Sequence, residues 1–293
     1  MLCGRMLWLV VCSCRLIAAL PPVKIMPMGD SLTVFDCRLN AYTNADDRPI
    51  FSPLDEVPPF SIYPKGAYWI NAQGGYRGYL AAMLGDPKRL PDDAAALPVW
   101  SYVGSQFSCG AHEGYSGETI EWLAQHSAAK AVGAYEPDVI LFMGGTNDFF
   151  WPAPRGSRSP AEVADRLRIL LNTTFAAAPN TTFLLSTTTG INATRCATYH
   201  TARWHPGDCP DDMQTNIDAY NQQHLPAVVA DYRARGFDIS LHDVNAEAGF
   251  VEADYWIWGI HFNATGFEKM ASSWHKALVK AAPMRAAMGL PRS

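Results

Sequence analysis

Short apolar runs alternate along the chain with longer helical stretches, and this alternation constrains the fold more than any other feature. The runs are nearly continuous in apolar character and rich in β-branched or aromatic residues, which is typical of strands covered on both faces. Such alternation predicts a parallel sheet with helices on both sides. The expected strands are residues 23–28, 99–103, 139–143, 182–187 and 239–244, and the expected helices are residues 75–84, 119–132, 160–177, 213–235 and 265–281.

The first 20 residues are typical of a secretory signal peptide. Arg5 precedes a short apolar run, and small residues at Ala18 and Ala19 come before Pro21. This order of charged, apolar and small residues favours a cleaved signal, and the apolar run is too short for a membrane anchor. We therefore expect a secreted, extracellular protein with one domain over residues 21–293, because no internal repeat or linker divides the rest of the chain.

Four of the seven cysteines would remain after removal of this segment. An even number suits two disulfides in an oxidising compartment. We expect Cys196 to pair with Cys209 across a short loop and, by elimination, Cys37 to pair with Cys109. The sequence has no Cys-x-x-Cys or paired-His spacing that would favour a metal site instead. Four possible N-glycosylation sites fit the same compartment: Asn172, Asn180, Asn192 and Asn263.

The charge balance bears on the partners of the protein. A formal net charge of −5 over 293 residues gives no case for nucleic acid or for an anionic membrane surface. We expect neither as a partner, and we expect a monomer.

The turn Gly29-Asp30-Ser31 ends the first expected strand abruptly. Open α/β sheets place their chemistry at the carboxyl ends of strands. We therefore interpret Ser31 as a nucleophile. The same triplet is ordinary in turns, so the interpretation depends on what the rest of the chain offers.

Two later turns carry possible oxyanion donors. Gly117 closes the turn Gly114-Tyr115-Ser116-Gly117 just before a helix, where its N–H can point into a cleft. The same turn also reads as a helix start capped by Ser116. Asn147, in Gly145-Thr146-Asn147-Asp148, can present its side-chain amide to a negative oxygen. Asp148 is expected to brace this loop.

One histidine is placed to act as a base. His261 lies in the loop Trp258-Gly259-Ile260-His261, just ahead of the last expected helix. From there the imidazole can reach back to Ser31, accept its proton and return it to the leaving group. Arg77, after Gly74 and Gly75, either binds substrate or pins a loop. Asp30 is a further possible substrate contact.

The series Gly29-Asp30-Ser31-Leu32, Gly117, Gly145-Thr146-Asn147-Asp148 and a late His resembles the SGNH, or GDSL-type, hydrolase superfamily over residues 23–281. The resemblance implies a flavodoxin-like three-layer α/β/α fold, here with a five-stranded parallel sheet. It implies ester hydrolysis without a cofactor or metal. It also implies Ser31 as nucleophile, His261 as base, and an oxyanion hole from the Ser31 and Gly117 N–H groups and the Asn147 side chain.

Within that superfamily, three stretches look like the carbohydrate-esterase group that includes acetyl xylan esterases. This likeness implies acetylated polysaccharide or a small acyl ester as substrate. The stretches are Gly74-Gly75-Tyr76-Arg77, Val103-Gly104-Ser105 leading to His112-Glu113-Gly114-Tyr115-Ser116-Gly117, and Gly266-Phe267-Glu268-Lys269-Met270-Ala271.

The chain departs from the superfamily near the catalytic His. Trp258 stands where the family usually has Asp, and Phe262 stands where it commonly has Pro. The His261 Nδ1–H needs an acceptor that fixes its tautomer. We favour the Trp258 main-chain carbonyl, with Asp254 second and an impaired site third. We expect Asn263 to cap the last helix and not to carry a glycan.

These observations together predict a secreted serine esterase acting on short acyl esters, acetyl above all, of plant cell-wall polysaccharide. A lipid or aryl esterase of the same fold is one alternative. The other is a carbohydrate-binding protein with an impaired site, motivated by Trp258 and the aromatic residues Tyr63, Tyr68 and Trp69.

Overall fold

A computed structural model describes residues 21–34, 75–85, 100–107, 110–197, 209–256 and 259–288. The expected signal peptide, the expected Cys37–Cys109 pairing, the aromatic residues between 35 and 74, and Trp258 lie outside the described residues. Predictions that concern them stay predictions.

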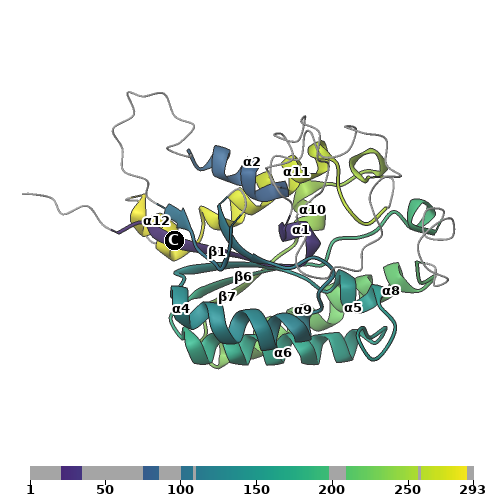
Figure 1. The fold of residues 1–293 in the computed structure, drawn as a ribbon, viewed down its shortest axis with the longest axis horizontal. Helices are drawn as coiled ribbons and strands as arrows, with labels where there is room; N and C mark the ends of the chain where they lie inside the picture. The colour runs from purple at the N-terminus through teal and green to yellow at the C-terminus, as the bar shows by residue number, and fades with distance from the viewer. Residues whose placement is uncertain are drawn as a thin grey trace, which may run out of the picture.

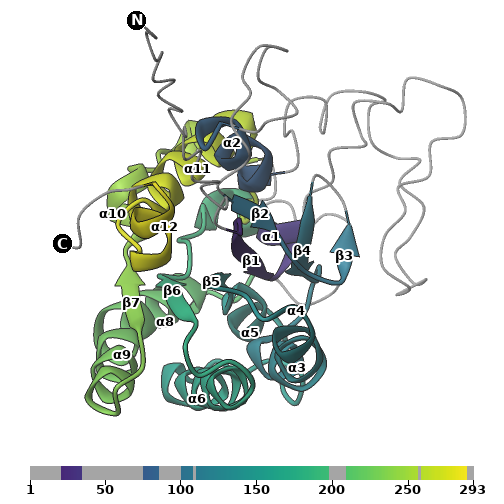
Figure 2. The same ribbon diagram turned by 90° about the vertical axis from the view of Figure 1, so that its left-hand side faces the viewer.

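A parallel sheet forms the middle layer (Figures 1 and 2). Its central strand β1 pairs on one side with β5, and β6 and β7 follow outward in parallel. The pairing sets Gly29, at the end of β1, opposite Met143 at the end of β5. These strands span Val23–Gly29 (β1), Val139–Met143 (β5), Thr182–Ser186 (β6) and Ile239–His242 (β7).

The other side of β1 holds two short strands in succession. β2 (Trp100–Tyr102) pairs with the start of β1, and β4 (Ala111–Gly114) pairs with its last two residues. β3 (Gln106–Phe107) runs antiparallel to β4 at the sheet edge. Taking β2 and β4 as one position, the parallel order is the flavodoxin-like 2-1-3-4-5.

The expected count of five strands was wrong, because the described sheet has seven. All five expected strands are present, and β3 and β4 are the additions. β4 has the sequence Ala-His-Glu-Gly, so it carries no apolar run. The carboxylate of its buried Glu113 accepts hydrogen bonds from the hydroxyls of Ser127 and Tyr115, each at 2.9 Å. These bonds allow a polar strand to be buried, so the strand has no apolar run that the sequence could show.

Each face of the sheet buries its own core. Ile140 and Phe142 of β5 pack with α3, α6 and α9, whereas the alternate residues Leu141 and Met143 pack with α2 and α11. Because successive side chains of a strand point to opposite faces, one apolar run serves both layers. These helices span Ile120–Leu123 (α3), Pro160–Ala177 (α6), Leu225–Ala234 (α9), Gly75–Met83 (α2) and Ala264–Leu278 (α11).

The expected helices are all found, two of them with π-helical stretches. α6 has the expected bounds, since the Ser159 side chain caps it and Pro160 opens it. The segment from α3 continues through Ala124–Val132 into α4 (Gly133–Tyr135), and α8 (Met213–Ala219) continues through Tyr220–His224 into α9. Shorter helices are α1 (Ser31–Val34), α5 (Thr146–Phe150), α10 (Val244–Ala248), the 3-10 turn Glu252–Asp254 and α12 (Ala282–Ala287).

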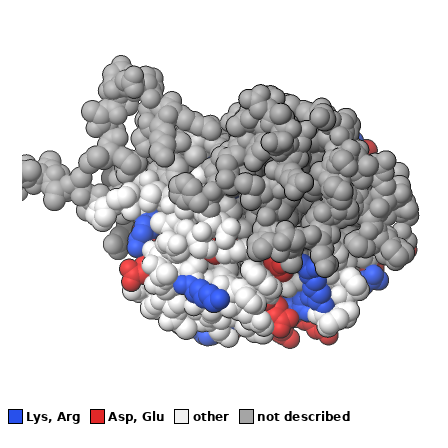
Figure 3. Space-filling view, in the orientation of Figure 1, with Lys and Arg blue, Asp and Glu red and all other residues white. Residues whose placement is uncertain are grey.

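Two surface properties follow from the described residues. None of their helices combines the length and the apolar character that a membrane crossing needs. On the face shown in Figure 3, Lys and Arg lie among Asp and Glu on the described part of the surface, without an expanse of one sign.

Candidate active site

Ser31 lies at the tip of β1, where the strand turns into α1. The turn is tight, because a Cβ atom on Gly29 would come within 2.0 Å of the Met143 carbonyl oxygen on β5. Only glycine therefore fits at this close approach. The Asp30 carboxylate accepts a hydrogen bond from the Leu32 N–H at 3.0 Å, which holds the first turn of α1. Ser31 itself remains partly exposed.

His261 lies in a loop whose two ends are hydrogen-bonded to each other. Tyr255 and Phe262 form an antiparallel bridge, and the Trp256 N–H donates to the His261 carbonyl at 2.8 Å. The loop docks on a neighbouring segment, since the Asn192 N–H donates to the Gly259 carbonyl at 2.7 Å. The backbone before α11 is thereby fixed at both ends.

The segment under this loop is closed by a disulfide. Cys196 and Cys209 are bonded, with an S–S distance of 2.08 Å, which confirms the predicted pairing. A Cβ on Gly259 would lie 2.7 Å from the Cys196 nitrogen, so the disulfide segment and the His261 loop are in close contact. The disulfide end at Cys196 therefore lies beside the loop that carries His261, whereas residues 198–208 between the two cysteines lie outside the described residues.

The structure brings the predicted nucleophile and base together. Ser31 Oγ lies 2.8 Å from His261 Nε2, although 230 residues separate them in the chain. Both residues are partly exposed, so a substrate can reach them. A hydroxyl hydrogen-bonded to an imidazole is the arrangement that nucleophilic catalysis requires.

The acceptor predicted for His261 Nδ1 lies outside the described residues, because it is the Trp258 carbonyl. The second choice, Asp254, is described and almost fully buried. Its Oδ2 accepts hydrogen bonds from Lys269 Nζ at 2.7 Å and from the Val251 N–H at 2.8 Å. Asp254 is thus part of an ion pair with α11.

The two predicted oxyanion donors follow strands adjacent to β1. Gly117 comes after β4, and Asn147 is the second residue of α5, after β5. The two turns are connected, because Asn147 Nδ2 donates to the main-chain carbonyl of Glu118, the residue after Gly117, at 3.0 Å. The side-chain amide nitrogen of Asn147 carries two hydrogens, so one is left for a substrate oxygen.

The predicted helix cap at Ser116 was wrong. Helix α3 begins at Ile120, and its cap is Thr119, whose hydroxyl accepts from the Trp122 N–H. The helix therefore starts later than expected, and Gly117 stays in the turn with a φ of +78°. At Asn263 the cap prediction is confirmed, because its Oδ1 accepts from the Gly266 N–H at 3.1 Å.

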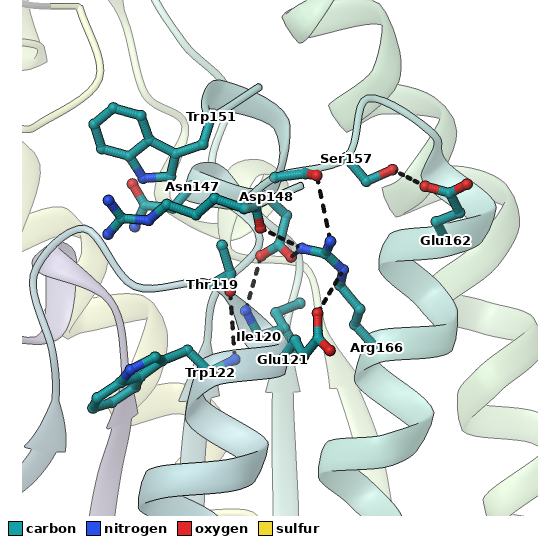
Figure 4. A network of polar contacts seen from close by, with 12 residues as sticks. Thr119, Ile120, Glu121, Trp122, Asn147, Asp148, Trp151, Ser157, Glu162 and Arg166 are labelled. Atoms are coloured by element: carbon teal, nitrogen blue, oxygen red, sulfur yellow. Dashed lines mark hydrogen bonds and ion pairs between the residues drawn. The ribbon is translucent and has the colours of Figure 1, made fainter. Parts of the chain in front are cut away.

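Asp148 braces the loops, as the sequence predicted. Its Oδ2 accepts from the Ile120 N–H at 2.9 Å, and its Oδ1 pairs with Arg166 Nη1 at 2.8 Å (Figure 4). Complete burial raises the pKa of the Asp148 carboxyl to about 6, against the opposing effect of these two partners. Asp148 thus joins the turn before α3 to helix α6.

The two possible substrate contacts are both buried. Burial and the nearby Asp148 carboxylate raise the pKa of Asp30 to about 7. Arg77 is inaccessible to solvent and donates to the carbonyls of Thr33 at 2.6 Å and Val34 at 3.1 Å. Of the two roles predicted for Arg77, these contacts match the pinning of the loop after Ser31.

Sequence reasoning missed three residues beside the site. Trp151 and Arg155 both donate to the Gly117 carbonyl, and Arg166 holds Asp148. Trp151 and Arg155 lie 34 and 38 residues from Gly117 in the chain, and no local motif marks them. Arg166 lies 18 residues from Asp148, in a different helix. For Trp151 and Arg155 the one sequence signal is their position shortly after Asn147 in the chain.

The described residues contain no group of three His, Cys, Asp or Glu side chains placed to hold a metal ion. The site as described therefore consists of a hydroxyl, an imidazole and amide donors.

The fold is similar to that of solved esterases. A family 3 carbohydrate esterase from Talaromyces cellulolyticus has a TM-score of 0.58 at 19% identity, covering 92% of this chain and 100% of that one. A Clostridium thermocellum family 3 carbohydrate esterase has a TM-score of 0.52 at 20% identity, covering 87% of this chain and 94% of that one. A mutant acetyl esterase with an acetate ion has a TM-score of 0.57 at 19% identity, covering 88% of this chain and 97% of that one. At such identities the likeness shows the fold, and it confirms the predicted α/β class.

Sequence comparison supplies the family. None of the curated protein sequences matches the chain. The profile of the GDSL-like lipase/acylhydrolase family, however, matches residues 63–269. The matched region begins after Ser31 and includes Gly117, Asn147 and His261. Because this match covers more than half of the chain, the protein belongs to the GDSL-like lipase/acylhydrolase family, as its motifs predicted.

Proposed function

We propose that this protein is a serine esterase that removes short acyl groups, acetyl above all, from plant cell-wall polysaccharide. The observation that carries the proposal is the 2.8 Å contact between Ser31 Oγ and His261 Nε2. Membership of an acylhydrolase family supports ester hydrolysis. The similar fold of two carbohydrate esterases and an acetyl esterase supports the choice of substrate.

The mechanism follows from the chemistry of these groups. Ser31 Oγ attacks the ester carbonyl carbon while His261 Nε2 accepts the hydroxyl proton. The negative oxygen of the tetrahedral intermediate binds the N–H groups of Ser31 and Gly117 and the amide of Asn147. Collapse breaks the ester C–O bond, and His261 returns the proton to the departing sugar hydroxyl. Water, deprotonated by His261, then attacks the acyl carbon. The bond from that carbon to Ser31 Oγ breaks, His261 returns the proton to Oγ, and the carboxylic acid is released.

For the second nitrogen of His261, we propose the Trp258 main-chain carbonyl as acceptor. Such a carbonyl fixes the tautomer without a negative charge. The alternative carboxylate, Asp254, is already paired with Lys269 on α11. A variant Asp254→Asn keeps an oxygen for the Val251 N–H and is therefore expected to retain most of the activity.

We further propose that the protein is secreted after cleavage near Ala19. This proposal is supported by the charged, apolar and small residues of the N-terminal segment. The disulfide Cys196–Cys209 fits an oxidising compartment. The amino-terminal sequence of protein recovered from a eukaryotic culture medium tests the cleavage site.

The function is tested by hydrolysis of p-nitrophenyl acetate and by acetate release from acetylated xylan. Ser31→Ala and His261→Ala should each lower kcat by about 10³-fold or more. A matched control is Ser273→Ala, because Ser273 Oγ on α11 and His242 Nε2 on β7 form another Ser–His contact, buried and at 2.6 Å. That variant should keep its activity, since the buried pair cannot meet a substrate.

Three outcomes separate the alternatives. Turnover that survives Ser31→Ala would remove the assigned nucleophile. Faster hydrolysis of long-chain than of acetyl esters would favour a lipid esterase. Binding of xylan with no turnover of any ester would instead favour a carbohydrate-binding protein.

A further inference from the structure

Two consecutive main-chain carbonyl groups beside the site, those of Gly117 and Glu118, each accept side-chain hydrogen bonds from one other segment of the chain. The Gly117 carbonyl accepts from Trp151 Nε1 and from Arg155 Nη2, each at 2.9 Å. The next carbonyl, of Glu118, accepts from Asn147 Nδ2 at 3.0 Å. All three donors belong to residues 147–155, which follow β5. The predicted oxyanion donors Gly117 and Asn147 are therefore tied to one another.

We propose that Trp151 and Arg155 form a carbonyl clamp, a pair of positioning residues that hold Gly117 so that its N–H faces the oxyanion. The inference rests on the proposed esterase function. Gly117 has a φ of +78° and lies outside any strand or helix. A glycine in a turn has several backbone conformations open to it, and only some of them aim its N–H at the same point. Two donors on its carbonyl select one conformation.

The clamp is itself held from two sides. The Arg155 guanidinium lies over the Trp151 ring, 4.6 Å from its centroid, and Nη2 lies 3.6 Å from Glu118 Oε2. The main-chain carbonyl of Arg155 accepts from Arg166 Nη1 at 2.9 Å. Because Arg166 also pairs with buried Asp148, the segment after α5 is anchored to helix α6.

Stability alone is a poor explanation of these contacts. The Arg155 side chain is 44% exposed, and exposed ion pairs contribute little to folding. In contrast, a small displacement of a donor in an oxyanion hole has a large effect on rate, because the donor must meet the oxygen as charge develops. The clamp should therefore act on the transition state and have little effect on the unfolding temperature.

The test uses two variants that each remove one arm of the clamp. Trp151→Phe keeps an aromatic ring and loses the indole N–H, and Arg155→Met keeps an unbranched stem and loses the guanidinium. Trp100→Phe is the matched control for the first, since Trp100 Nε1 donates to the Leu84 carbonyl at 3.2 Å, at the other end of β1. Arg168→Met is the control for the second, because Arg168 pairs with exposed Asp165 on α6.

We expect each clamp variant to lower kcat on p-nitrophenyl acetate by about 10- to 100-fold, with KM changed less than about 2-fold. Phenylboronic acid forms a tetrahedral adduct with an active serine, and its affinity should fall in parallel with kcat. The unfolding temperature should match that of the controls. A merely structural role would change the unfolding temperature and leave the boronate affinity of the folded protein intact.

Two results would overturn the inference, and they are distinguishable from each other. If the wild type is active and both clamp variants keep kcat and boronate affinity within about 2-fold of their controls, the clamp does not position Gly117. If the wild type shows no turnover beyond that of Ser31→Ala, the proposed function fails, and the clamp inference fails with it.

Discussion

The buried carboxyl beside the nucleophile makes the stability of this protein depend on pH in a direction that can be worked out. Burial, together with the nearby Asp148 carboxylate, raises the pKa of Asp30 from 3.8 to about 7. An unfolded chain releases this proton near pH 4, whereas the folded chain keeps it until about pH 7. Between these values the native state binds more protons than the unfolded state. Stability should therefore fall as the pH rises through this window and level off above it.

The size of the effect follows from the same shift. A shift of about three pKa units corresponds to roughly 4 kcal/mol of unfolding free energy between pH 4 and pH 8. The variant Asp30→Asn removes this ionisation and keeps an oxygen for the Leu32 N–H. We expect the variant to be more stable than the wild type at pH 8 by up to this amount, and to lose that advantage near pH 4.

Urea unfolding at intervals between pH 4 and pH 8.5 measures the effect, and the difference between the two profiles isolates Asp30. Asp148 also lowers the unfolding free energy as the pH rises, because its pKa is raised to about 6, but this decrease is present in both proteins. Asp165→Asn, at a surface carboxylate on α6, reports the effect of removing a charge as such. Parallel profiles for wild type and Asp30→Asn would refute the reasoning, since Asp30 would then ionise alike in both states.

Three further predictions concern the His261 loop and the start of helix α11. Replacing Cys196 and Cys209 together by Ser should lower the unfolding free energy by about 2–4 kcal/mol in urea titrations and also lower kcat, because the loop docks on this segment; unchanged stability would contradict it. Asn263→Ala should cost about 1 kcal/mol through loss of the α11 cap, whereas Asn263→Asp should cost less, because an Asp oxygen also caps. Mass spectrometry of wild type from a glycosylating host should show no glycan at Asn263, since its Nδ2 donates to the Ala253 carbonyl at 2.7 Å.

Most of the sheet could be predicted from the sequence, because parallel strands buried on both faces are almost purely apolar. β5 and β6 are the clearest cases, with every residue buried. β4 is as deeply buried, yet its sequence is Ala-His-Glu-Gly. Its polar groups are satisfied by partners from elsewhere in the chain, such as Ser127 on the helical segment after α3. No pattern within four residues can show that such partners exist.

The site divides in the same way. Ser31, Gly117, Asn147 and His261 each lie within a few residues of the end of a strand or the start of a helix, and the apolar pattern of the sequence marks these places. The roles of Arg77 and Arg155 could not be settled from the sequence, since an Arg side chain serves equally well in a substrate site or on main-chain carbonyls. Arg77 is buried and donates to carbonyl groups of α1, whereas Arg155 is exposed and donates to the carbonyl of Gly117.

The nucleophile and the oxyanion donors are held by different means, and this difference decides how substitutions should act. Ser31 is positioned by the register of β1 with β5 and by the close contact of Gly29 with the Met143 carbonyl, so its place depends on the sheet itself. Gly117 lies beyond the end of β4 and depends on side chains, those of Trp151 and Arg155. Changes in the clamp should therefore leave the contact between Ser31 and His261 intact and slow only the steps in which negative charge forms on the substrate oxygen. Substrate binding precedes those steps, which is why we expect kcat to fall without a matching change in KM.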